Sequence, residues 1–213
     1  MARAVTGNMK PQKNKFLLYF FMEQIKETIR SMIEISDEEM DKFLSKTSVR
    51  KIKKNQILSK PDIIPTDIYF INSGMLRVTV TDETAVEHTI HFALENQFIS
   101  DYSSFLMQQK SIYTFQALED TEVVVLPRAA ILWGYDNLTN GNKLGRLIAE
   151  FYFIYQDARV KNMYTVSPKK RYDIITDIFP NIHNRVPQHM IASYLGITSV
   201  HLSRLKKTGT KKT

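Results

Sequence analysis

The chain has 213 residues, of which 43% are hydrophobic and 24% are charged, so it is long enough for two modest globular domains. It contains no cysteine, which excludes disulfides, thiolate zinc sites and Cys-ligated iron–sulfur clusters and suits the reducing environment of the cytoplasm. The net charge of +7 is carried entirely by the last 47 residues, Ser167 to Thr213, with nine Lys or Arg against two Asp, and this favours a polyanionic partner.

Residues 1–15 form a basic leader that lacks the apolar segment of a signal peptide, and we expect this leader to be flexible. The longest apolar run, Phe16 to Met22, is far shorter than the roughly 20 residues that a bilayer crossing needs. Two short helices are predicted next. The first follows from the helical spacing of Phe20, Ile25, Ile29 and Met32. The second follows from Ser36 and Glu39, which have the spacing of a helix-starting capping box.

From Ser48 to Leu126 the sequence changes to short β-type runs separated by turn residues. The runs are VRKI, QILSK, IYFI, MLRVTV, EHTIHFAL, IYTFQAL and EVVVL. Because no long helix separates them, they predict an antiparallel jelly roll and not a βαβ fold. We place this β-roll, with the N-terminal helices, at residues 16–139 of an α+β chain.

Helical spacing returns after Pro127, with a short helix at Ala129, Ala130 and Trp133 and a long helix from about Asn142 to Thr165. The long helix carries an apolar stripe of Leu144, Leu147, Phe151, Ile154 and Ala158, widened by Ile148 and Tyr155. Such a stripe either docks on the β-domain of its own chain or forms the seam of a parallel dimer. We assign residues 140–166 to a dimerisation helix, because two-fold symmetric proteins read paired half-sites on DNA.

Ser167 followed by Pro168 has the pattern of a helix start and opens a C-terminal domain over residues 167–213. Within it, residues 188–207, QHMIASYLGITSVHLSRLKK, fit a helix-turn-helix. Ala192 is the small residue needed where the two helices touch, and Gly196 tolerates the positive φ of the turn. The positions that must bury the crossing are all apolar: Ile191, Leu195, Ile197, Leu202 and Leu205.

Thr198 is a good N-cap for the second helix of this pair, so the residues after it lie on a solvent face that would enter the major groove of DNA. We expect Arg204 to read a guanine, and Val200 to face a thymine methyl group or the groove wall. The tail Thr208 to Thr213 would add backbone contacts. The other predicted DNA-contacting residues are Gln188, His189, Thr198, Ser199, His201, Ser203, Lys206 and Lys207.

From about Phe20 to Lys207 the chain resembles the Crp/Fnr family of bacterial transcription regulators. The resemblance lies in the order of the predicted parts, which are a jelly roll, one long helix and a terminal helix-turn-helix. The local matches are IYFINSGMLRV with its turn glycine Gly74, FALENQFISDYSSFL, which looks like the phosphate-binding cassette, and QALEDTEVVVL. The pattern VPQHMIASYLGITSVHLSRLKK is similar to the branch common in Bacteroidetes-type bacteria. The resemblance implies a cytoplasmic homodimer that binds a palindromic double-stranded DNA site, contacts RNA polymerase at promoters, is not an enzyme and senses a small effector in a cyclic-nucleotide-binding-like roll.

The cassette departs from the members of the family that bind cyclic nucleotides. Those members hold the ribose with a Gly-Glu pair and the cyclic phosphate with an Arg followed by a small residue. Ser111 occupies the arginine position and cannot replace a guanidinium, while Lys110 would lie on the opposite face of an extended segment. We therefore expect neither a cyclic nucleotide nor another cofactor, and predict a pocket for an unidentified effector around Ser100, Asp101, Ser111 and Tyr113. Ile112 takes the position after the arginine.

Two other functions stay open at this point. The chain could be a ligand-binding jelly roll whose helical domain docks on a protein, or a cupin-type enzyme with His88, His91 and Glu95 as metal ligands. Residues three apart on a strand point to opposite faces, so the two histidines could share a metal only across a bulge. Haem would need an axial histidine, for which the roll offers only His88 and His91. We predict that there is no metal site.

Overall fold

The computed structural model describes residues 11–209 of the chain. Helix α1 (Pro11–Met32) begins inside the segment predicted as a leader, and residues 1–10 lie outside the described residues. Helix α2 (Asp37–Leu44) starts with the predicted capping box: the N–H of Glu39 donates to Ser36 Oγ at 3.2 Å, and the N–H of Ser36 donates to Glu39 Oε2 at 3.2 Å.

The strands that follow form the predicted jelly roll. They are β1 (Ser48–Ile52), β2 (Ile57–Ser59), β3 (Asp67–Ser73), β4 (Leu76–Thr81), β5 (Glu87–Ala93), β6 (Phe98–Ile99), β7 (Tyr113–Ala117) and β8 (Thr121–Pro127). They pair antiparallel in two sheets with the orders β1-β8-β3-β6 and β2-β7-β4-β5. Each β-type run of the sequence overlaps one of these strands, whereas the two-residue β6 and helix α3 (Tyr102–Met107) after it were not predicted.

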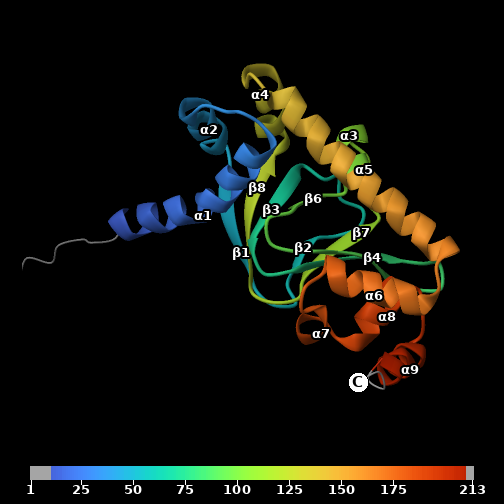
Figure 1. Ribbon diagram of the computed structural model, residues 1–213. Helices are drawn as coiled ribbons and strands as arrows, with labels where there is room; N and C mark the ends of the chain where they lie inside the picture. The colour runs from blue at the N-terminus through green and yellow to red at the C-terminus, as the bar shows by residue number, and fades with distance from the viewer. Residues whose placement is uncertain (1–10, 210–213) are drawn as a thin grey trace, which may run out of the picture.

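Alternating side chains of the two sheets fill the interior of the roll. Ile52, Ile71, Leu76, Ala117 and Val123 are all 1% exposed or less. A second cluster lies on the outer side of the first sheet, where Ile25 and Ile29 of α1 pack with Phe43 of α2 and Phe70 of β3. The N-terminal helices therefore cover one face of the roll, as Figure 1 shows.

Helix α4 (Arg128–Asn137) leads into the long helix α5 (Gly141–Thr165), which runs along the roll (Figure 1). The apolar stripe of α5 is divided between two surroundings. Leu144 is 7% exposed and, with Leu147, packs in the cluster of the N-terminal helices. Phe151 and Ile154 are instead 57% and 66% exposed. Docking on the chain's own β-domain thus accounts for the first part of the stripe and leaves the second part on the surface.

Four further helices gather at one end of the roll (Figure 1). They are α6 (Pro168–Ile178), α7 (Ile182–Arg185), α8 (Gln188–Leu195) and α9 (Ser199–Gly209). Helix α6 starts as predicted, because Ser167 Oγ accepts the N–H of Lys170 at 3.3 Å and Pro168 is its first residue. No helix in the described part of the chain is both long enough and apolar enough to cross a membrane.

Gly74 joins β3 to β4 with a φ of +92°, and a Cβ at this position would lie 2.7 Å from Thr121 Cα and 2.8 Å from the carbonyl oxygen of Asp120. Both atoms belong to backbone that cannot rotate away. We expect Gly74→Ala to lower the free energy of unfolding, measured by urea denaturation, by about 2 kcal/mol or more. Ser73→Ala, at the exposed neighbouring residue, should change it by less than about 0.5 kcal/mol. Equal effects of the two substitutions would contradict this account of the turn.

Candidate nucleic-acid interface and interior cavity

The C-terminal helix pair has the ends that the sequence predicts. Helix α8 ends at Gly196, whose φ of +66° lies in the left-handed region. Helix α9 begins after Thr198, whose hydroxyl accepts the N–H of His201 at 3.2 Å. The turn between the helices also contacts α5, because a Cβ on Gly196 would lie 2.6 Å from Met163 Cε. The left-handed φ and this close approach favour glycine in the turn.

The predicted apolar positions bury the crossing of α8 and α9. Ile191, Leu195 and Leu202 are 2% exposed or less, and Ile197 and Leu205 are partly buried. Ala192, the small residue expected at the helix contact, is 1% exposed. The pair is therefore a packed helix-turn-helix with one face turned inward.

Its outward face carries most of the residues predicted to contact DNA. Val200 is 61% exposed, and Arg204 and Lys207 are also exposed. Ser203 and Lys206 are half-buried. The remaining predicted residues are exposed: Gln188, His189, Thr198, Ser199 and His201. Helix α9 lies at the opposite end of the molecule from α4, so the roll does not cover this face (Figure 1). Of the predicted tail, residues 210–213 lie outside the described residues.

Not every basic residue of the C-terminal domain faces outward. The guanidinium of Arg171 donates to the carbonyl oxygens of Met163 and Val166 at 3.2 and 2.9 Å and so caps the end of α5. Arg185 is turned toward the β-roll. Arg171 and Arg185 therefore have partners within the fold, so the outward basic charge is smaller than the sequence count suggests.

Helix α8 covers an edge of the β-roll. Strand β5 is the last strand of its sheet, and an edge strand presents backbone groups without strand partners. Ser193 of α8 satisfies one of these groups, because its Oγ accepts the N–H of Thr89 at 2.8 Å. The rings of Phe92 and Tyr194 lie 5.4 Å apart, and Phe179 lies 5.9 Å from Phe92. The helix-turn-helix domain is thus packed against its own roll by apolar and polar contacts.

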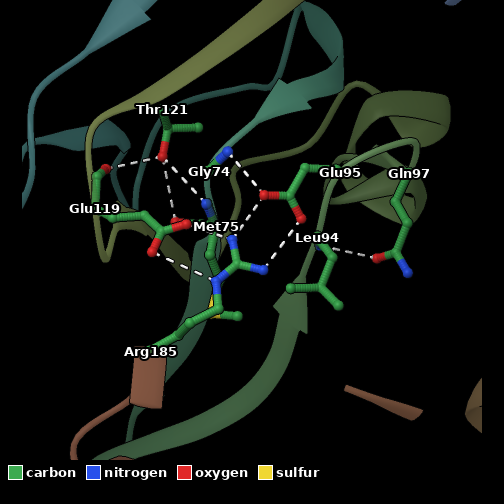
Figure 2. A network of polar contacts seen from close by, with 8 residues as sticks. All are labelled: Gly74, Met75, Leu94, Glu95, Gln97, Glu119, Thr121 and Arg185. Carbon is green, nitrogen blue, oxygen red and sulfur yellow. Dashed lines mark hydrogen bonds and ion pairs between the residues drawn. The ribbon is translucent and has the colours of Figure 1, made fainter. Parts of the chain in front are cut away.

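An ion-pair cluster, here called the Arg185 cluster, joins the same two parts (Figure 2). Arg185 at the end of α7 donates from Nη2 to Glu95 Oε1 at 2.7 Å and from Nη1 to Glu95 Oε2 at 3.1 Å. It also pairs with Glu119 through Nη2 and Nε. Glu95 is fixed to the roll, because its Oε1 accepts the N–H of Gly74 at 3.0 Å. One guanidinium therefore links the turns β5–β6 and β7–β8 to the C-terminal domain.

The charges of the Arg185 cluster stabilise one another. Partial burial acts to raise the pKa of Glu95, but hydrogen bonds from Arg185 and the N–H of Gly74 outweigh it and hold that pKa below its usual value. Hydrogen bonding to Glu119 and Glu95 raises the pKa of Arg185. Glu95 and Arg185 are therefore both charged at neutral pH.

A chain of hydrogen bonds runs from the interior of the roll to α8. His91 of β5 contacts the hydroxyl of Tyr155 on α5 through Nδ1 at 3.1 Å, and this hydroxyl lies 2.8 Å from that of Tyr194 on α8. Burial, and then the positive charge of Arg159, lower the pKa of His91 to about 3, so its imidazole is neutral at physiological pH. The second ring nitrogen, Nε2, has no hydrogen-bond partner among the described residues.

His91 also lines a cavity of about 540 Å³ between the roll and helices α4 and α5. Three residues of the predicted effector pocket line it: Ser100, Asp101 and Tyr113. Ser111, the fourth, is not among the lining residues. It is 2% exposed, and its hydroxyl accepts the N–H of Tyr113 at 3.0 Å, so it shapes the segment beside the cavity instead.

The two neighbours of Ser111, the residue at the position of the family's phosphate-binding arginine, do not face the cavity. Ile112 is 61% exposed, and Lys110 is exposed on the loop before β7. Neither of them lines the cavity. The prediction that Lys110 does not take the place of the arginine therefore agrees with its position.

The three residues considered as cupin ligands have separate partners. Strand β4 has a register shift between Val78 and Thr79, opposite the segment of β5 that contains both histidines. The pairing of β4 with β5 is therefore irregular there. His88 nevertheless turns to Asp82, with 2.6 Å between Nε2 and Oδ2, while His91 turns to Tyr155 and Glu95 to Arg185. Among residues 11–209, no three His, Asp or Glu side chains come together as a metal site.

Several residues of these sites were not expected from the sequence. In the sequence, Arg185 is one of nine basic residues of the C-terminal domain, and no motif marks Tyr194. Tyr155 lies on the apolar stripe, and no nearby residue indicates a partner for its hydroxyl. Their partners lie 39 to 90 residues away along the chain, so no local spacing could have revealed the contacts.

Comparison with known families supports this architecture. Residues 49–136 match the family described as the cyclic nucleotide-binding domain. A search of the curated proteins found no match to the chain.

Solved structures with a similar fold come from several bacteria. FixK2 from Bradyrhizobium japonicum has a TM-score of 0.65 at 12% identity, over 76% of this chain and 83% of that chain. A protein from Eubacterium rectale, described as a transcriptional regulator of the Crp/Fnr family, has a TM-score of 0.63 at 15% identity, over 82% of this chain and 83% of that chain. CLP, a c-di-GMP-responsive global regulator of Xanthomonas campestris, has a TM-score of 0.63 at 11% identity, over 82% of this chain and 92% of that chain. At these identities the similarity shows a shared fold.

The Arg185 cluster should hold the C-terminal domain against the roll. Arg185→Met leaves Glu95 and Glu119 facing each other without a cation, and we expect the docked state to lose about 1–2 kcal/mol. Hydrogen exchange of the α8 amides should then be faster by a factor of about 5–30. Lys60→Met removes an equal charge at an exposed residue and should leave this exchange unchanged. Unchanged exchange in Arg185→Met would show that the cluster does not hold the domain.

Proposed function

We propose that this chain, which has the fold of Crp/Fnr transcription regulators and a β-roll matching the cyclic nucleotide-binding domain, is a sequence-specific DNA-binding regulator. In this proposal it acts in the cytoplasm as a homodimer on a palindromic site, contacts RNA polymerase at promoters, and responds to a small effector in the roll. It carries out no reaction of its own.

The exposed face of α9 is the observation that carries the proposal. The apolar side of α9 packs on α8, which in turn packs on the roll, while Val200 and Arg204 face outward beside Lys207. An exposed helix face with a basic end fits the major groove, where a guanidinium reads guanine and an apolar group meets a thymine methyl group. We assign base reading to Arg204, Val200 and Ser199. Phosphate or backbone contacts are assigned to Gln188, His189, Thr198, His201, Ser203, Lys206 and Lys207.

The exposed part of α5 supports the homodimer. Leu147, Phe151, Ile154 and Ala158 recur at alternating spacings of four and three residues, which is the pattern of a coiled-coil seam. Phe151 and Ile154 are more than half exposed in the single chain. A second α5 in parallel would cover these side chains and set two copies of α9 at a fixed separation.

The division between base reading and phosphate contact can be measured with two substitutions. Arg204→Ala should weaken binding to a site selected from random DNA by about 1–3 kcal/mol and weaken binding to unselected DNA much less. Lys207→Ala, as the matched control, should weaken both by similar amounts and reduce the slope of log K against log salt by about 1. Equal losses on the two DNAs for Arg204→Ala would sink its base-reading role. A flat salt slope in the unmodified chain would favour a protein-docking function for the helical domain.

The dimer is tested separately by sizing. Ile154→Glu places a charge in the proposed seam and should shift the protein from dimer to monomer at micromolar concentration, because a buried unpaired carboxylate is strongly unfavourable. Ile63→Glu is the control, because Ile63 is also an exposed isoleucine, at 54%, but lies outside α5. The dimer proposal fails if the unmodified chain already elutes as a monomer.

A further inference from the structure

The cavity between the roll and helices α4 and α5 has a lining that favours one class of ligand. Its volume of about 540 Å³ lies within the range of roughly 300–1,000 Å³ that is usual for small-molecule sites. Most of the lining is aliphatic or aromatic, with Ile68 and Phe115 from the roll and Ile148 and Tyr152 from α5. A ligand in this cavity would therefore bury mainly apolar surface.

The charge of the lining is the opposite of what a phosphate needs. Among the described residues that line the cavity there is no Lys or Arg, and Asp101 is the only charged side chain. Asp101 is 6% exposed. Burial, and then the negative charge of Asp101, raise the pKa of Tyr113, while the positive charge of Arg159, which lies outside the lining, acts to lower it. A cyclic phosphate would meet a carboxylate and no cation among the described lining residues, so this lining disfavours anions.

Two residues of the lining each have a buried polar atom with unused hydrogen-bonding capacity. Asp101 Oδ1 accepts the N–H of Ser104 at 3.2 Å and the hydroxyl of Ser103 at 3.1 Å, but Oδ2 has no partner among the described residues. The same holds for Nε2 of His91, which is 5% exposed. A buried carboxylate oxygen without a donor costs about 1–3 kcal/mol or more, and a ligand donor would recover this.

We propose that the cavity binds an uncharged or cationic, mainly apolar small molecule whose hydroxyl or amino group donates a hydrogen bond to Asp101 Oδ2. His91 Nε2 would be the second polar contact. This step rests on the proposed function, in which binding of such a ligand would regulate DNA binding. His91 is linked by Tyr155 to Tyr194 on α8, so a ligand touching its ring acts on the hydrogen bonds that help position the helix-turn-helix.

Two fluorescent probes of similar shape test the proposal on the full chain. N-phenyl-1-naphthylamine is uncharged, apolar and carries an N–H donor, whereas 1-phenylnaphthalene lacks the donor. We expect one amine probe to bind per chain, about tenfold more tightly than 1-phenylnaphthalene. Cyclic AMP at millimolar concentration should not displace it. Equal affinity for the two probes, or displacement by cyclic AMP, would overturn the proposal.

Substitutions locate the contact. Asp101→Asn keeps an oxygen to cap α3 but puts an NH₂ group in place of one carboxylate oxygen, so it should remove the preference for the amine probe while changing the affinity for 1-phenylnaphthalene less than about twofold. Ala149→Phe fills the cavity from α5 and should abolish binding of both probes. Ala129→Phe makes the same change on an exposed position of α4 and should have no effect. Unaltered binding in Ala149→Phe would show that the probes bind elsewhere and would overturn the proposal.

The outcome is independent of DNA binding. A chain that binds the amine probe with the expected preference but binds no DNA would contradict the proposed function and leave the ligand class intact. A chain that binds DNA but purifies with the visible absorption band of haem would contradict the ligand class alone.

Discussion

The packing of α8 against edge strand β5 is the contact on which the rest of this structure depends. It satisfies the N–H of Thr89 through Ser193, buries Phe92 against Phe179 and Tyr194, and is reinforced by the Arg185 cluster. Because α8 is fixed on the roll by its inner face, α9 is left with its outer face on the surface. The same contact brings Tyr194 to the hydrogen-bond chain that starts at His91 in the cavity wall. The cavity wall and the helix-turn-helix are thus linked through one interface.

Helix α5 connects these parts in a different way. Its first turns pack on the roll through Leu144, while Phe151 and Ile154 remain exposed. Tyr155, on the inner side, lies between the cavity wall and α8. A single helix can therefore close the cavity, carry a dimer seam and contact the helix-turn-helix, because each role uses a different side of the helix.

The sequence was a good guide wherever short-range physical rules decide the structure. Short β-type runs between turn residues predicted seven of the described strands, and the caps at Ser36, Ser167, Gly196 and Thr198 have the expected geometry. The five apolar positions at the crossing of the helix-turn-helix were identified because helical spacing determines which residues meet.

Contacts between segments far apart in the sequence could not be predicted from these short-range rules. Nothing near Arg185 in the sequence indicates that it pairs with Glu95 and Glu119, which are 90 and 66 residues away. Ser111 was placed in the pocket by counting along the chain, whereas its hydroxyl is engaged by the backbone of Tyr113. The apolar, acidic character of the cavity depends on side chains from the roll, α4 and α5 together, and only their packing reveals it.

The central claim is that this chain reads DNA sequence as a dimer, and selection of bound sites from a random pool of double-stranded DNA tests it most directly. The account predicts enrichment of a palindrome whose half-sites are centred about one helical turn, roughly 34–36 Å, apart. The same selection repeated with a cell extract would reveal control by an effector through a change in the recovered fraction. Recovery of sequences without any shared motif would contradict the account.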